Sequence, residues 1–374
     1  MEERIDFESL ESELKRVEEL IISDYIDQAT QILTPIIVEN PEIVNGKNGW
    51  QIFNLIDSLI EQDPAEATGI LTPLAQNPEI VNRNKYRMFE SINLLIKQNS
   101  AQAIKILTQI IQSKNLNKLS PKVQIDLASS LIRLAGATQG EEQQQYLKQA
   151  TEILTPIVQN PEMVNENDFQ IFNSINLLIK QNPVEAAGIL TPMAQPENLN
   201  QLNPRAQINL VNNLIRLAGA IQGEEQQQYL KQATQILTAM AQNPEIVNNR
   251  VYGWRIFNSI DLLIRQNHIK QATGILTLMV QPKNLNKLSP RAQINLANSL
   301  IGLAGATQGE ERQQYLAQAA KIPTPLAQSE NLNQLDPRVQ IDLTNNLTIL
   351  TGANQDFEQR IDMKKQQKSS QQGI

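Results

Sequence analysis

The sequence contains no cysteine and a single histidine, His268, among its 374 residues. Without cysteine the chain cannot form disulfides, thiolate zinc sites or a cysteine nucleophile. One imidazole also leaves no second histidine for a multi-histidine metal site. We therefore expect neither a metal site nor a cofactor.

Long apolar runs are missing too, and aromatic residues make up only 4% of the chain. No apolar stretch reaches the roughly 18 residues that a membrane span needs. The acidic, amphipathic segment 1–15 is unlike a secretory signal, and the net charge of −7 argues against a general polyanion binder. We expect a cytoplasmic protein without a membrane partner, with a core of Leu, Ile and Ala.

What the chain does contain is an internal repeat marked by alanine. In each repeat an alanine follows Gln or Glu and stands three residues ahead of a hydrophobic pair, usually Ile-Leu. The alanines are Ala29, Ala67, Ala103, Ala150, Ala186, Ala233, Ala272 and Ala319. Short steps of about 36–39 residues mostly alternate with long ones of about 47, a period typical of stacked helical hairpins.

Each repeat predicts two helices. In segment 169–200, apolar residues from Ile171 to Ile179 recur at helical spacing and predict a first helix, called A. Asn182-Pro183 then supplies a cap and a first-turn proline for a second helix, B, which carries the repeated alanine. A methyl group there permits A and B to approach closely.

This pattern predicts an all-α fold, a right-handed α-solenoid of about eight helix-turn-helix repeats with alternating short and long units. We expect a capping helix at 1–22, the solenoid at 22–353, and a polar, disordered tail at 354–374.

Two further patterns predict where the A helices of the long units begin and end. A capping side chain stands before a proline at Ser120, Asn203, Ser289 and Asp336. Glycine follows the last apolar positions at Gly136, Gly219 and Gly305. We expect the first set to cap helix N-termini and the second to form left-handed C-terminal caps.

Segments 50–57 and 254–261, which read WQIFNLID and WRIFNSID, resemble the start of a pentatricopeptide unit. The hairpin pattern over residues 22–353 resembles tetratricopeptide and pentatricopeptide repeats. The first family implies binding of peptides and proteins, the second of single-stranded RNA base by base. The base-selecting position just ahead of A carries mostly Gly and Pro, at Gly49, Pro121, Pro204, Gly253, Pro290 and Pro337. Glycine and proline cannot read a base edge, so the base-recognition code of pentatricopeptide repeats does not apply to this chain.

Aligning the A helices shows four rows of residues that share one helix face, at relative offsets −4, 0, +3 and +7. Row 1 holds Trp50, Tyr86, Lys122, Phe169, Arg205, Trp254, Arg291 and Arg338. Row 2 holds Asn54, Glu90, Asp126, Asn173, Asn209, Asn258, Asn295 and Asp342. Row 3 holds Asp57, Asn93, Ser129, Asn176, Asn212, Asp261, Asn298 and Asn345. Row 4 holds Glu61, Lys97, Arg133, Lys180, Arg216, Arg265, Gly302 and Ile349.

In a solenoid these rows would line the concave surface. They carry nine basic and six acidic residues, so this face is mildly basic in an acidic protein. As binding candidates we take Trp50, Asn54, Asn93, Lys97, Lys122, Arg133, Asn173, Asn176, Lys180, Arg205, Asn209, Asn212, Arg216, Trp254, Asn258, Arg265, Arg291, Asn295, Asn298 and Arg338. The rows could instead be a solvated face with Asn ladders between helices, or they could bind single-stranded nucleic acid.

No catalytic constellation is evident. The pairs Glu141/Glu142, Glu224/Glu225 and Glu310/Glu311 stand at predicted helix starts, where the helix dipole favours carboxylates. We expect His268 to be a surface histidine, and no Ser or Thr has a nearby base. The sequence thus predicts a non-enzymatic scaffold that binds a protein or peptide on its concave face. The alternatives are an RNA binder and a purely structural subunit of a larger assembly.

Overall fold

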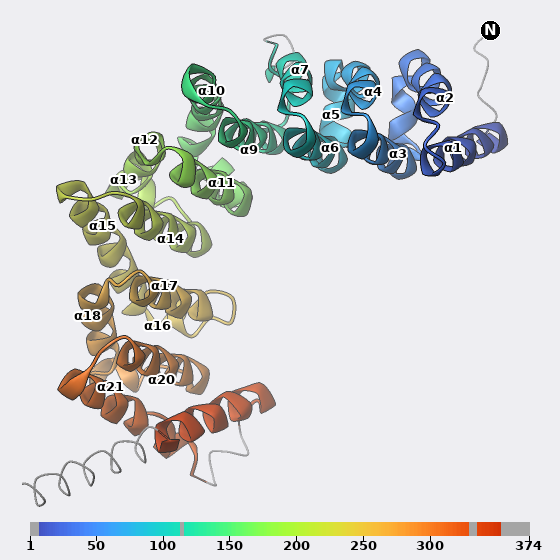
Figure 1. Ribbon diagram of the computed structural model, residues 1–374. Helices are drawn as coiled ribbons and strands as arrows, with labels where there is room; N and C mark the ends of the chain where they lie inside the picture. Colours follow the sequence, from blue (N-terminus) through green and yellow to red (C-terminus); the bar gives the residue numbers. More distant parts are fainter. Residues whose placement is uncertain (1–6, 113–115, 329–334, 353–374) are drawn as a thin grey trace, which may run out of the picture. The chain divides into compact units, whose positions relative to one another are not determined.

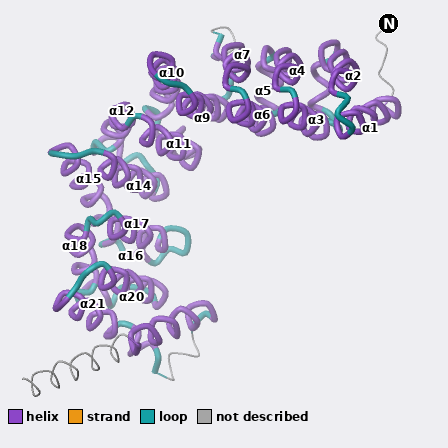
Figure 2. The backbone as a smooth tube through the Cα atoms, viewed as in Figure 1, coloured by secondary structure: helices purple, strands orange, loops and turns teal. Residues whose placement is uncertain are grey.

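The chain is helical throughout the part that the computed structural model describes, residues 7–112, 116–328 and 335–352. These residues form about 21 α-helices and one 3-10 helix, and no β-strand occurs among them (Figure 2). The all-α prediction is confirmed. The polar tail expected at 354–374 lies outside the described residues.

The first of two compact units spans residues 1–202. Its helices are α1 (Phe7–Ile22), α2 (Ile26–Glu39), the 3-10 helix η1 (Pro41–Asn45), α3 (Gly49–Gln62), α4 (Pro64–Gln76), α5 (Pro78–Arg83), α6 (Lys85–Gln98), α7 (Ser100–Ile111), α9 (Pro121–Ala137), α10 (Gly140–Val158), α11 (Pro161–Gln181), α12 (Pro183–Met193) and α13 (Pro196–Leu199). The A helices α1, α3, α6, α9 and α11 each pack on the next, and each A helix packs on the B helix that follows it (Figure 1).

The second unit spans residues 203–374. Its helices are α14 (Pro204–Ala220), α15 (Glu224–Ala241), α16 (Pro244–Val247), α17 (Gly253–Arg265), α18 (Ile269–Met279), α19 (Pro282–Leu285), α20 (Pro290–Gly305), α21 (Gly309–Lys321) and α22 (Pro323–Leu326), followed by a helix over residues 337–352. The A helices α14, α17 and α20 pack in the same order, each against its B helix, α15, α18 or α21. In each unit this packing is that of a helical repeat.

The repeated alanines all lie on B helices, and all eight have no exposed surface. On the A helices the apolar positions next to the rows are buried, as with Phe53, Ile92 and Leu178. The apolar face of each A helix is therefore buried in the core, and the four rows lie on its opposite face.

The predicted N-caps are confirmed in three cases. Asn203 and Ser289 accept a hydrogen bond from the amides of Ala206 and Ala292, and Asp336 accepts one from Arg338. The prediction is wrong for Ser120, whose side chain makes no capping hydrogen bond.

The glycine prediction is also wrong. Helices α9 and α14 continue past Gly136 and Gly219, and the left-handed glycines are Gly140, Gly223 and Gly309, just before or at the start of each B helix. A Cβ at Gly136 would lie 2.7 Å from Nε2 of Gln181, and one at Gly219 would lie 2.9 Å from Oε1 of Gln266. Both neighbours are the ends of flexible glutamine side chains from the end of the next A helix, and neither glycine adopts a left-handed conformation.

Asparagines that end the Pro-Glu-x-Val-Asn segments tie successive repeats together. The side chain of Asn248 donates to the carbonyl of Lys287 (2.9 Å) and accepts from the amide of Ser289 (2.7 Å). Asn82 makes the same pair of bonds to Lys118 and Ser120. One carboxamide thus satisfies two backbone groups ahead of the next A helix, which fixes the spacing between repeats.

Replacing Asn248 by alanine should lower the free energy of unfolding by about 1–3 kcal/mol, because two backbone groups lose their partner. Urea denaturation of the full chain measures this change. Asn286→Ala, an exposed asparagine of the same loop, is the matched control and should change stability by under about 0.5 kcal/mol. Equal losses of stability in both variants would show that the Asn248 bridge contributes no more to stability than an exposed asparagine does.

Candidate binding groove on the A helices

In the first unit the four rows lie on α3, α6, α9 and α11, which pack side by side. No row residue of this unit is buried; those of rows 1 and 4 are exposed and those of row 3 are half-buried. The expectation that these positions face away from the A–B core is confirmed. Their role in binding stays a prediction.

A groove of about 1150 Å³ crosses this face. It is lined by Asp57, Glu61, Lys85, Tyr86, Phe89, Glu90, Asn93, Leu94, Ile96, Lys97, Asp126, Ile132, Arg133, Gly136, Ala137, Leu177, Lys180 and Gln181. The lining comes from four A helices of the first unit, α3, α6, α9 and α11, so one ligand there would touch four consecutive repeats.

The structure brings four predicted binding residues into the groove, namely Asn93, Lys97, Arg133 and Lys180. It leaves Trp50, Asn54, Lys122, Asn173 and Asn176 outside the lining, on the same face.

The binding set from the sequence omitted the groove's four carboxylates, Asp57, Glu61, Glu90 and Asp126. Their positions in rows 2 to 4 were the signal that could have included them. Lys85 and Gln181 were missed because they belong to no row and reach the groove from the ends of α6 and α11.

The charges of the groove balance, with four basic and four acidic side chains in its lining. They are also separated in space. The acidic residues Glu90 and Asp126 occupy row 2, whereas Lys97, Arg133 and Lys180 occupy row 4, seven residues further along each helix. Because seven residues are about two helical turns, the two sets lie roughly 10 Å apart. The separation is partial, because Glu61 also lies in row 4 and Lys85 stands just ahead of row 1. The groove is thus mainly acidic along row 2 and mainly basic along row 4.

Several side chains of row 3 form hydrogen bonds between neighbouring A helices. Buried Ser91 of α6 donates to Asp57 of α3, and Ser130 of α9 donates to Asn93 of α6 (3.1 Å). Ser129 of α9 shares a hydrogen bond with Ser174 of α11. Hydrogen bonds between A helices are thus present, but serine hydroxyls form them and only one of the three involves an asparagine, so they are not the Asn ladder that the sequence left open.

Asp126 lines the groove and is half-buried. Burial raises its pKa to about 6, and the positive charge of Lys85 opposes this shift. Burial also raises the pKa of Asp57, while the hydrogen bond from Ser91 opposes it. A cationic group on a ligand would stabilise the charged form of Asp126.

The second unit carries the basic surplus of the rows, with five basic and two acidic members. Its predicted residues are half-buried (Arg205, Asn209, Asn212, Arg216 and Asn295) or exposed (Trp254, Asn258, Arg265, Arg291, Asn298 and Arg338). Burial, and then the charge of Arg265, lowers the pKa of Arg216, so these two guanidinium groups repel each other. In row 3, Asp261 accepts a hydrogen bond from Ser299 of α20 (2.8 Å).

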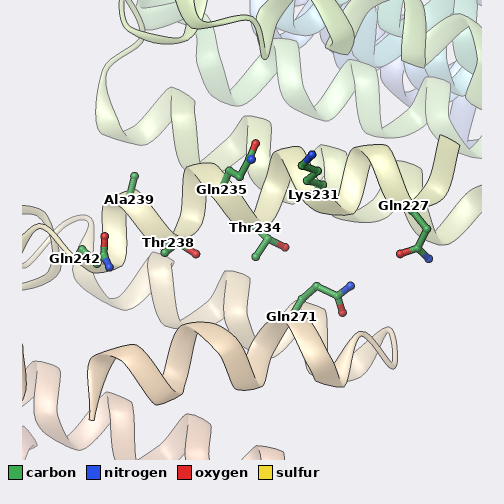
Figure 3. A pocket seen from close by; sticks show the side chains of 8 residues that line it. All are labelled: Gln227, Lys231, Thr234, Gln235, Thr238, Ala239, Gln242 and Gln271. Carbon is green, nitrogen blue, oxygen red and sulfur yellow. The ribbon is translucent and has the colours of Figure 1, made fainter. Parts of the chain in front are cut away.

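A smaller hollow of the second unit lies between the B helices α15 and α18. Gln271 of α18 points toward Thr234 and Gln227 of α15 across it, whereas Lys231 and Gln235 point to the other side of α15 (Figure 3). Its side chains are mostly amides and hydroxyls without a charged pair. It is less distinctive than the groove of the first unit.

Other potential sites are sparse in the described part of the chain. No group of three His, Asp or Glu side chains there could hold a metal ion, and no described helix is long and apolar enough to cross a membrane. His268 is half-buried at the N-terminus of α18, and burial lowers its pKa. The three glutamate pairs stand in the first turns of α10, α15 and α21, as predicted.

Replacing Asp126 by asparagine should stabilise the protein at about pH 7.5, and this gain should vanish at about pH 4. The folded-state pKa of about 6 exceeds the ordinary value of 3.8, so the charged carboxylate destabilises the folded state. The wild type therefore loses stability as pH rises from about 4 through 6, whereas the variant with a neutral asparagine does not. Urea unfolding at the two pH values tests this. Asp342→Asn, exposed in the same row, is the control and should gain nothing. A gain that persists at about pH 4 would contradict burial as the cause.

Comparison with known proteins adds little to this description. No protein-family model and no curated protein sequence matches the chain. Among solved structures the chain is similar to a "Circular tandem repeat protein with novel repeat topology and enhanced subunit contact surfaces". The identity is 15%, the match covers 92% of this chain and 83% of that one, and the TM-score is 0.28. A score this low carries no argument about function, and the helical repeat is established by the packing described above.

Proposed function

We propose that this protein is a non-enzymatic helical-repeat scaffold that binds a protein or peptide segment across its A helices. The groove of the first unit carries this proposal, because it spans four repeats and offers separate acidic, amide and basic side chains. Amide rows can hydrogen-bond an extended backbone, and charged rows can select its side chains.

We further infer a right-handed solenoid of about eight hairpins with the A helices on its concave side. The eight alanine-marked B helices and the alternation of short and long units support this architecture. The cytoplasmic location stays a prediction from composition.

Reversing the three charges of row 4 in the groove, by Lys97→Glu, Arg133→Glu and Lys180→Glu together, should abolish peptide capture. Peptides are first selected from an unbiased display library by the full chain, and their affinities for the wild type and the variant are then measured. The variant should bind them more weakly by over about tenfold, or about 1.4 kcal/mol. The far-ultraviolet circular dichroism should not change, because these side chains are exposed.

The matched control reverses Lys15, Lys105 and Lys148, exposed lysines of the same unit outside the groove. It makes the same change in net charge and should bind like the wild type. If the library yields no peptide whose binding depends on row 4, the groove assignment fails.

Single-stranded RNA is the alternative ligand, supported by the exposed aromatic and basic residues of rows 1 and 4. The four carboxylates of the groove oppose it, because they would face phosphates. Filter binding of mixed-sequence RNA at two salt concentrations distinguishes the two, since phosphate contacts make binding strongly salt-dependent.

A purely structural role is the second alternative, and the last A helix favours it. Ile341 of the helix 337–352 is 60% exposed, whereas its counterparts in earlier A helices, such as Phe257 and Ile294, are buried. The same helix exposes Ile349. This surface would normally receive a further repeat, so a second copy of the chain could cover it.

If it does, sedimentation of the full chain should show concentration-dependent association that the double variant Ile341→Ser, Ile349→Ser removes. Val251→Ser, which changes an exposed apolar residue of the same unit, is the control. A monomer at all concentrations would eliminate the structural alternative and leave the scaffold proposal untouched.

A further inference from the structure

The A helices of the second unit carry arginine as their only basic residue type. Helices α14, α17, α20 and 337–352 hold six arginines and no lysine, against two aspartates. The whole unit follows the same trend. Residues 203–374 contain 17 Lys and Arg and 12 Asp and Glu, whereas residues 1–202 contain 15 and 27. The second unit is therefore basic, and the first is strongly acidic.

Two of these arginines come together on neighbouring helices. Arg216 of α14 and Arg265 of α17 share row 4, and the two helices pack on each other. Their ends approach closely at this level. A Cβ on Gly219, three residues after Arg216, would lie 2.9 Å from Oε1 of Gln266, which follows Arg265. Burial, and then the charge of Arg265, lowers the pKa of the Arg216 guanidinium. The fold thus holds two like charges near each other.

The protein supplies little negative charge to this pair. Among the described residues none forms an ion pair with Arg216 or Arg265. Asp261, one turn before Arg265, interacts with its charge but accepts a hydrogen bond from Ser299. The helix dipole favours Arg265, in the last turn of α17, but not Arg216, which lies before the last turn of α14. A half-buried cation without a counter-ion is unfavourable, so a bound anion would stabilise the pair.

The surroundings of the pair favour a polypeptide anion over nucleic acid. The planar guanidinium group binds both oxygens of a carboxylate, and it binds phosphate in the same way. Stacking of successive bases needs several aromatic rings. The rows of this unit contain one, Trp254, and Arg255 lies over that ring, 5.0 Å from its centroid. The exposed amides of Asn258 on α17 and Asn298 on α20 can instead hydrogen-bond a peptide backbone.

We propose that the A helices of the second unit bind an acidic segment of another protein, with a side-chain carboxylate held between Arg216 and Arg265. Further acidic residues of the segment reach exposed Arg291, in row 1 of α20. Rows 1 and 4 are eleven residues apart along a helix, or about 16 Å, which about five or six extended residues span. This surface is not the groove of the first unit, and the proposal goes beyond the function proposed for that groove.

Fluorescence anisotropy of a labelled peptide with the full-length protein tests this proposal. The peptide has about twelve residues, with glutamate alternating with glycine, and both ends are blocked so that only side-chain carboxylates carry charge. In the comparison peptide glutamine replaces each glutamate. The glutamate peptide should bind saturably, at least about tenfold more tightly than the glutamine peptide. Added salt should weaken its binding, because the contacts are between charges.

Arg216→Gln and Arg265→Gln should each weaken binding of the glutamate peptide by about tenfold, since each removes one side of the carboxylate's site. Because Arg265 is exposed, its variant keeps the test valid even if the change at half-buried Arg216 disturbs folding. Arg312→Gln, which removes an exposed arginine from the B helix α21, is the matched control and should bind like the wild type. Equal affinity for the two peptides, or binding that Arg265→Gln leaves unchanged, overturns the proposal.

Two other occupants of this face give different results. If a single-stranded oligonucleotide binds more tightly than the glutamate peptide and Arg265→Gln removes that binding, the face binds nucleic acid and the proposal is wrong. If the wild type self-associates in sedimentation and Arg265→Gln removes the association, the occupant is a second copy, whose first unit is acidic, and the proposal is again wrong. The experiment on row 4 of the first unit uses other residues, so either proposal can fail while the other stands.

Discussion

The packing of each A helix on its B helix, which carries the buried repeated alanine, is the constraint on which the rest of the structure depends. All eight alanines are fully buried, so a larger side chain at any of them would have to displace its neighbours. Once one face of A is sealed against B and its neighbours, the residues at the other offsets must face outward. The four rows thus follow from core packing, and their composition was free to vary for other purposes.

Polar bonds then set how successive repeats line up within each unit. Apolar burial is not directional and would tolerate sliding of one hairpin along the next. The asparagine bridges from Asn82 and Asn248 act at one end of the A helices, and the serine ladder through Ser91 and Ser130 acts midway along them. Fixing the register in this way is what turns equivalent residues on separate helices into continuous rows.

The sequence was sufficient for features that depend on local spacing, and insufficient for those that depend on the next helix. Helix type, the outward rows and the caps at Asn203 and Ser289 follow from residues close together in the chain. Gly136 is not a left-handed cap, and the side chain that it meets, Gln181, comes from another helix. Ser120 failed as a cap, whereas its backbone amide binds Asn82 of the preceding repeat. The lining residues Lys85 and Gln181 were missed for the same reason, because they reach the groove from the ends of α6 and α11.

The electrostatics of the groove argue for selection of a segment by its pattern rather than by its charge. Four positive and four negative side chains produce little net field, so long-range attraction of any polyion is weak. Close to the surface, however, row 4 is mainly basic and the row 2 residues that line the groove are acidic, so its two sides differ. A segment crossing the helices therefore meets two different edges. Turning it end for end would exchange the side chains presented to those edges, so the groove distinguishes the two directions of a bound chain. A groove lined by charges of one sign could not do this.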